Sequence, residues 1–95
     1  MGRIAENVYT DQHDIAVLEA RAAQLPDEAR VQIVLVDGSR IKGVVATRPV
    51  VQMFLDEEGR EGSNGVARID DAHAPGRAHL LWLDQILEIV TLEMD

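Results

Sequence analysis

The chain has 95 residues, no cysteine, and 17 acidic against nine basic side chains, which gives a formal net charge of −8. This length accommodates one hydrophobic core, so we expect a single domain over residues 1–95. The lack of cysteine excludes disulfides, thiol catalysis and thiolate metal sites. The acidic balance repels phosphate backbones at long range, and the three aromatic residues are too few for a row of stacked bases.

No targeting or membrane segment is expected. The first residues, Met1 to Glu6, lack the apolar run of a signal peptide, and Glu6 stands where myristoylation requires Ser or Thr. The apolar run from Leu80 to Leu83 is far too short for a membrane span. These features predict a cytoplasmic protein that does not enter a membrane.

A mostly polar lead-in over 1–9 precedes a helix, which we predict over 10–25. Thr10 or Asp11 supplies the N-cap, and Pro26 ends the helix. Apolar residues recur at spacings of three and four, which places them on one side of this helix: Ile15, Leu18, Ala22 and Leu25.

From Val31 the apolar residues alternate with a period of two, which is typical of a half-buried strand. Asp37 and Gly38 then form a strong hairpin signal, and a return strand follows from about 40 to 47. Gly43 inside that strand indicates a sharp bend or a close backbone contact. We expect Asp37, Gly38 and Gly43 to determine the fold.

The rest of the chain alternates short strands with turns. Further strands are predicted at 50–56, 66–70, 79–82 and 87–92. The segment 56–65 is predicted to be a long, polar, flexible loop, and tight turns are predicted at 71–77 and 83–86. One helix followed by short antiparallel strands predicts a mainly β (α+β) domain, in which residues 31–92 form a strongly bent five-stranded barrel.

No group of residues points to catalysis, a cofactor or a metal. Four possible metal donors occur together, but their spacing fits no known closed site: Asp70, Asp71, His73 and His79. The acidic segment 56–61 lacks the alternation of a calcium loop, and Gly62 to Gly65 lacks the Lys-Ser or Lys-Thr of a nucleotide-binding loop. Neither serine lies in a nucleophile motif. We therefore expect a protein that is not an enzyme.

Two segments resemble known motifs. Residues 31–45, VQIVLVDGSRIKGVV, combine alternating apolar residues with glycines at 38 and 43. Within the stretch 31–55, this pattern resembles the first motif of the Sm and Sm-like proteins of the Hfq superfamily. Residues 83–90, LDQILEIV, resemble the second motif, and the N-terminal helix is in the corresponding place. The chain also resembles a small bacterial family of proteins of unknown function that has a variant Sm-like fold.

The resemblance implies a bent five-stranded barrel that joins copies of itself through edge strands, and rings of such proteins bind single-stranded RNA. In the loop 47–53, however, Val50 and Met53 lie where polar base contacts are expected. The second motif usually carries an Arg-Gly pair, whereas Asp84 lies in that neighbourhood here. The fold therefore follows from the resemblance more directly than the RNA site does.

Five polar residues are left as possible contacts to RNA or to a protein partner: Arg40, Lys42, Arg48, Gln52 and Gln85. Arg40 and Lys42 share one face of their strand, which is either a small phosphate-binding strip or an ordinary solvated face. Two hypotheses follow. The first is a non-enzymatic assembly or protein-interaction module that oligomerises through edge strands; the alternative is single-stranded RNA binding by an Sm-like oligomer.

Overall fold

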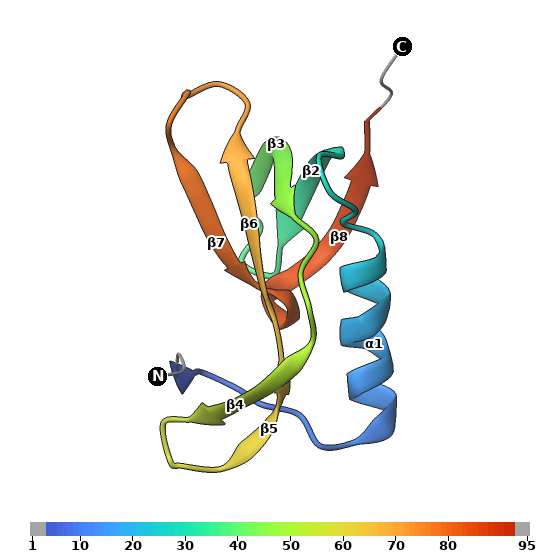
Figure 1. The fold of residues 1–95 in the computed structure, drawn as a ribbon, viewed down its shortest axis with the longest axis vertical. Helices are drawn as coiled ribbons and strands as arrows, with labels where there is room; N and C mark the ends of the chain where they lie inside the picture. The colour runs from blue at the N-terminus through green and yellow to red at the C-terminus, as the bar shows by residue number, and fades with distance from the viewer. Residues whose placement is uncertain (1–3, 93–95) are drawn as a thin grey trace.

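The computed structural model describes residues 4–92, which form one helix and two β-sheets stacked along the long axis of the molecule (Figure 1). The elements are β1 (Ile4–Ala5), α1 (Gln12–Ala23), β2 (Arg30–Leu35), β3 (Arg40–Thr47), β4 (Gln52–Asp56), β5 (Glu61–Asn64), β6 (Val66–Asp71), β7 (Ala78–Trp82), the 3-10 turn η1 (Leu83–Gln85) and β8 (Ile86–Thr91). The helix lies along one side of the molecule (Figure 1).

The larger sheet has five strands in the order β7-β6-β3-β2-β8, all antiparallel. The smaller sheet has three strands in the order β1-β4-β5, in which β1 is parallel to β4. Two connections join the sheets: residues 48–51 between β3 and β4, and the single residue Gly65 between β5 and β6. Two long strands are therefore bent from one sheet into the other.

Glycines occupy the positions where backbones come closest. A Cβ on Gly65 would lie 2.6 Å from a methyl carbon of Leu83 and 2.9 Å from the carbonyl oxygen of Val50, so a side chain does not fit at this bend. A Cβ on Gly43 would lie 2.2 Å from the carbonyl oxygen of Asp70 on the neighbouring strand. Of the two explanations for Gly43, the structure supports the close backbone contact.

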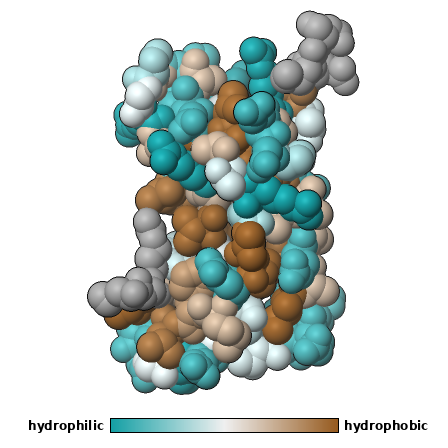
Figure 2. All heavy atoms as spheres, in the orientation of Figure 1, coloured by the Kyte–Doolittle hydropathy of each residue, from teal (hydrophilic) through white to brown (hydrophobic). Residues whose placement is uncertain are grey.

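The helix begins after Asp11, whose carboxylate accepts hydrogen bonds from the backbone N–H groups of His13 and Asp14. It is shorter than the predicted 10–25, because residues 24 and 25 lie in the turn after its last residue. Its buried residues Leu18 and Ala22 belong to the same hydrophobic cluster as the inner side chains of the five-stranded sheet. The buried core consists of Leu18, Ala22, Leu25, Val31, Ile33, Val45, Ala67, Ile69, Leu81, Leu83 and Ile86. Figure 2 shows hydrophobic residues in a band across the middle of the molecule.

The predicted hairpin between β2 and β3 is present. Gly38 has a φ of +92°, a backbone conformation that glycine adopts without strain. The carboxylate of Asp37 accepts hydrogen bonds from the backbone N–H and the hydroxyl of Ser39, at 2.9 and 2.6 Å. These bonds, of which that from the hydroxyl is the stronger influence, hold the pKa of Asp37 below its usual value.

The fold class is confirmed, with three differences in detail. The strands do not close into a barrel, because the bent strands continue into a separate three-stranded sheet. The segment 56–65 is a short turn followed by β5, so our prediction of one long loop is wrong. The lead-in is also structured, since β1 pairs with β4 and Tyr9 forms a bridge to Ser63.

The strand predicted to begin at Val50 begins at Gln52 instead. The preceding Pro49 cannot donate to a strand ladder, and residues 48–51 carry the chain between the two sheets. Among residues 4–92, no helix is long and apolar enough to cross a membrane.

Candidate functional site

Three basic side chains of β2 and β3 lie on the solvent-facing side of the five-stranded sheet, which also carries Arg68 on β6, paired with Asp70. Arg40 lies opposite Val34, Lys42 opposite Gln32, and Arg30 opposite Val44, which places all three basic residues on the face away from the core. All three are exposed. Arg30 and Lys42 line a surface pocket of about 350 Å³ together with Gly43, Val44, Asp71, Ala72 and Leu92. The sequence pattern located Arg40 and Lys42 on this face but missed Arg30.

The other three predicted contact residues lie on different elements. Arg48 follows β3, and its backbone N–H donates to the carboxylate of Asp27. Gln52 opens β4 in the three-stranded sheet. Gln85 lies in η1, where its carbonyl oxygen accepts a hydrogen bond of 2.8 Å from the backbone N–H of Val36. The structure therefore brings Arg40 and Lys42 together and leaves the other three on separate elements.

A polar network surrounds the turn η1, where the second Sm-like motif begins. The Tyr9 hydroxyl donates to Asp84 Oδ2 at 2.9 Å, and Asn64 Nδ2 donates to Asp84 Oδ1 at 3.1 Å. Asn64 is 1% exposed and also donates to the carbonyl oxygen of Asn7, while its own Oδ1 accepts from the backbone N–H of Gly65. Burial, followed by the hydrogen bond to Asp84, raises the pKa of Tyr9 to about 12. Both oxygens of Asp84 are thus engaged within the chain.

The same turn lines a pocket of about 180 Å³ between α1 and η1. Its wall combines Asp14, Arg21 and Tyr9 with apolar side chains of the core. Arg21 Nη2 donates to the carbonyl oxygen of Leu87 at 3.0 Å, so this arginine ties the helix to β8. No local sequence signal indicated this group, because Tyr9, Asn64 and Asp84 are far apart in the sequence.

One of the possible metal-donor pairs does come together, as a hydrogen-bonded pair in the β6–β7 hairpin. His79 Nε2 lies 2.7 Å from Asp71 Oδ2, and Asp71 Oδ1 accepts from the backbone N–H groups of His73 and Ala74. The bond to His79, and then those to the backbone, lower the pKa of Asp71 to about 2. Within the described part of the chain, no three His, Asp or Glu side chains form a group that could hold a metal.

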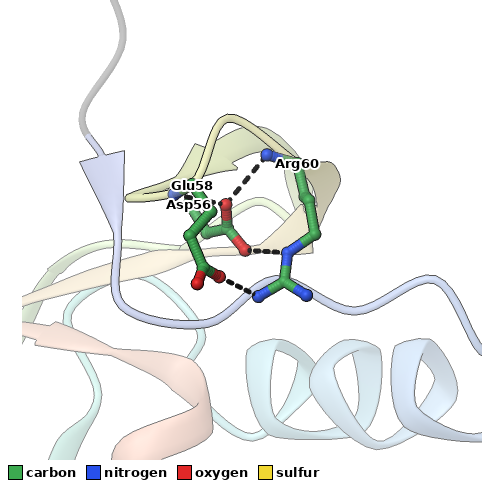
Figure 3. Close-up of polar contacts among 3 residues, drawn as sticks. All are labelled: Asp56, Glu58 and Arg60. Atoms are coloured by element: carbon green, nitrogen blue, oxygen red, sulfur yellow. Dashed lines mark hydrogen bonds and ion pairs between the residues drawn. The ribbon is translucent and has the colours of Figure 1, made fainter.

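The hairpin between β4 and β5 is closed by Asp56 and Arg60 (Figure 3). Asp56 Oδ1 accepts hydrogen bonds from the backbone N–H groups of Glu58 and Arg60, and Asp56 Oδ2 accepts from Arg60 Nε at 2.9 Å. Glu58 also contacts the Arg60 guanidinium. The bonds from Arg60 hold the pKa of Asp56 below its usual value. This turn replaces the first half of the predicted loop.

Among residues 4–92, β7 and β8 are the edge strands of the five-stranded sheet, and on the β8 edge the carbonyl of Leu87 already accepts a hydrogen bond from Arg21 of α1. In the antiparallel β6–β7 ladder, hydrogen-bonded residue pairs alternate with pairs that are not hydrogen-bonded. The hydrogen-bonded pairs are identified by the backbone bonds from Asp71 N to Arg77 O and from Leu83 N to Gly65 O. It follows that Ala78, Leu80 and Trp82 direct their backbone N–H and C=O groups away from β6. By the same argument from the bond Leu92 N to Arg30 O, Ile89 and Thr91 direct theirs away from β2.

This architecture is a variant of the Sm-like motif. The crystal structure of XC5848 from Xanthomonas campestris, described as adopting a novel variant of the Sm-like motif, is 43% identical and matches with a TM-score of 0.90. The match covers 98% of this chain and 100% of that chain. The resemblance inferred from the two sequence motifs is confirmed.

The family profile of a domain of unknown function, DUF3247, matches residues 2–92, and the chain belongs to this family. No curated protein matches the chain.

Proposed function

We propose that the protein is a non-enzymatic assembly module that joins copies of itself through the open edges of the five-stranded sheet. The observation that carries the proposal is the outward direction of backbone N–H and C=O groups on both β7 and β8. An edge strand with unpaired groups is a template for another strand, and natural proteins either protect such edges or use them.

The side chains on these edges support the same proposal. Leu80 on β7 is 52% exposed, and Val90 on β8 is also exposed. Both lie on the face of the sheet that is directed away from the core, because Leu80 is opposite Arg68 and Val90 is opposite Gln32. If β7 of one copy pairs with β8 of the next, the sheet continues and these two apolar side chains meet across the junction.

A junction between β7 and β8 is heterologous, since the two surfaces that meet are different. Such contacts form closed rings when the rotation between copies allows closure. We therefore propose a homo-oligomer with a single repeated contact.

The test is native mass spectrometry of the wild type and of Leu80→Pro. Proline removes the outward N–H at position 80 without removing a donor to β6, so its effect is directed at the edge. We expect an oligomer for the wild type and a monomer for the variant. Val36→Glu, which places a charge on an exposed valine in the β2–β3 turn, is the control and should assemble as the wild type does. A monomeric wild type, or a Leu80→Pro variant of unchanged mass, contradicts the proposal.

The alternative function is single-stranded RNA binding, and the three basic residues Arg30, Arg40 and Lys42 favour it. Phosphate contacts make binding strongly dependent on salt. We expect the double variant Arg40→Ala, Lys42→Ala to abolish any binding of a U-rich or A-rich oligonucleotide at low salt. If the double variant still binds the oligonucleotide, Arg40 and Lys42 are not the contact residues, and this alternative is contradicted.

A further inference from the structure

The pocket between α1 and η1 combines an apolar floor with side chains of both charges. Its volume is about 180 Å³. Leu18, Leu83 and Ile86 line the pocket and are all buried, so they form its floor. Because a cavity of about 150 Å³ holds one benzene molecule, this pocket has room for a ligand of about ten heavy atoms or fewer. Part of that ligand should be apolar, since it rests on the floor.

One end of the pocket is acidic. The oxygens of Asp84 accept hydrogen bonds from the Tyr9 hydroxyl and from Asn64 Nδ2. The pKa of Tyr9 is raised first by burial, then by its hydrogen bond to Asp84, and then by the charges of Asp84 and Asp14. Asp14 also lines the pocket, and its exposed side chain makes no hydrogen bond or ion pair among residues 4–92. Two carboxylates therefore face this end.

The other end of the pocket holds the half-buried guanidinium of Arg21. Arg21 is seven residues after Asp14 on α1, which separates the two Cα atoms by about 10 Å along the helix axis. Its Nη2 donates to the carbonyl oxygen of Leu87 at 3.0 Å and its Nη1 to Gln24 Oε1 at 3.5 Å, which leaves further N–H donors for a ligand. In the described part of the chain, no carboxylate forms an ion pair with Arg21.

We propose that this pocket binds a small ω-amino acid, in which an ammonium group and a carboxylate are joined by a short chain of methylene groups. The ammonium group lies beside Asp14 and Asp84, and the methylene groups cover the apolar floor. The carboxylate accepts hydrogen bonds from Arg21, whose guanidinium matches carboxylate geometry.

The separation of the two charged ends determines which ligands fit. An α-amino acid carries both charges at one end, so it reaches either Asp14 or Arg21 but not both. A simple amine or a simple carboxylate uses one end and leaves its apolar tail against a charged side chain at the other, which disfavours it. The site is separate from the proposed junction between β7 and β8, because no residue of β7 lines the pocket.

The test is a titration of the isotope-labelled protein with ε-aminocaproate, followed by two-dimensional amide NMR. We expect the amide signals of residues 14–21 and 83–86 to shift until the site is saturated, while those of β3 and β6 stay in place. Norleucine is the isomer of this ligand with both charges at one end, and it should bind about tenfold more weakly or less tightly still. Hexylamine and caproate, which each lack one charge, should also bind more weakly.

Variants of the two ends test the assignment of the residues. Arg21→Gln should weaken ε-aminocaproate binding by about tenfold or more, because it removes charged hydrogen bonds. Asp14→Asn should weaken it severalfold, since Asp84 remains at that end. The matched control is Glu19→Gln, which removes a charge from an exposed residue of the same helix that does not line the pocket, and it should bind as the wild type does.

The spectrum of each variant also reports whether it is folded, and the exposed Asp14 keeps the test decisive if Arg21→Gln unfolds. The proposal is overturned if ε-aminocaproate shifts no amide around the pocket. It is also overturned if norleucine or hexylamine binds as tightly, or if the folded Asp14→Asn or Arg21→Gln variant binds as Glu19→Gln does.

Discussion

Each of the two sheets is stabilised internally by a different kind of contact. The five-stranded sheet packs branched aliphatic side chains such as Val31, Ile33 and Ile69 beneath the helix, all without exposed area. The buried residues of the three-stranded sheet and its lead-in are small or polar, namely Ala5, Asp56, Gly62 and Asn64. The larger sheet therefore depends on the burial of apolar area, whereas the smaller one depends on hydrogen bonds and close backbone contact.

The largest effect is expected from truncating the core of the five-stranded sheet. Ile69→Ala should reduce the free energy of unfolding by about 3 kcal/mol, since it removes a fully buried side chain and leaves a cavity. Leu55→Ala in the three-stranded sheet is the counterpart, and we expect about 1 kcal/mol or less because nearly half of that residue (46%) is already exposed. Urea denaturation measures both. Equal losses of unfolding free energy in the two variants would contradict the difference in stabilisation between the two sheets.

Removal of a buried amide should have the next largest effect. Asn64→Ala leaves the backbone N–H of Gly65 without its acceptor and cuts the contacts to Asn7 and Asp84, for an expected loss of about 2 kcal/mol. Asn7→Ala is the control, because only the backbone carbonyl of Asn7 takes part. If both variants unfold at the wild-type urea concentration, the network around η1 does not hold the smaller sheet.

The same difference explains what the sequence could predict. The β2–β3 hairpin follows from neighbouring residues, because the alternation from Val31 and the turn at Gly38 are local signals. The pairing of Ile4 with Leu55, by contrast, joins distant segments and leaves no periodic pattern. The segment 56–65 resembled a loop because its residues are polar, and its strand depends on the Asp56 turn and on the bridge from Tyr9.

The candidate site was predictable to a similar degree. Alternation along β3 places Arg40 and Lys42 on the solvent face without any knowledge of the fold. Arg30 shares that face, but it lies one residue before the predicted start of its strand; its two-residue spacing from Gln32 was the available signal. The open edges of β7 and β8 depend on strand order, which no local pattern encodes.

A smaller effect on the free energy of unfolding, which depends on pH, is expected at the β6–β7 hairpin of the five-stranded sheet. The pKa of Asp71 is lowered to about 2, below its value in an unfolded chain, so this carboxylate stabilises the fold above about pH 4. That contribution is lost as the pH falls toward 2. We expect Asp71→Asn to be less stable than the wild type at pH 7, with the difference shrinking between pH 4 and pH 2 in urea denaturation. The exposed Asp70→Asn is the control, and a difference of constant size would contradict the assignment.

The smallest effect should be confined to the three-stranded sheet. Asp56→Ala removes the acceptor that closes the β4–β5 turn, so the amides of residues 61–64 should exchange with solvent several-fold faster, while those of β2 and β3 are unchanged. Asp56→Asn keeps an oxygen for the backbone N–H groups of Glu58 and Arg60 but loses the charge that pairs with the guanidinium, so its exchange should be intermediate. The exposed Glu57→Gln serves as control, because no hydrogen bond or ion pair from its side chain occurs among the described residues. If Asp56→Ala accelerates exchange equally in both sheets, the sheets open as one unit and the smaller one has no separate means of stabilisation.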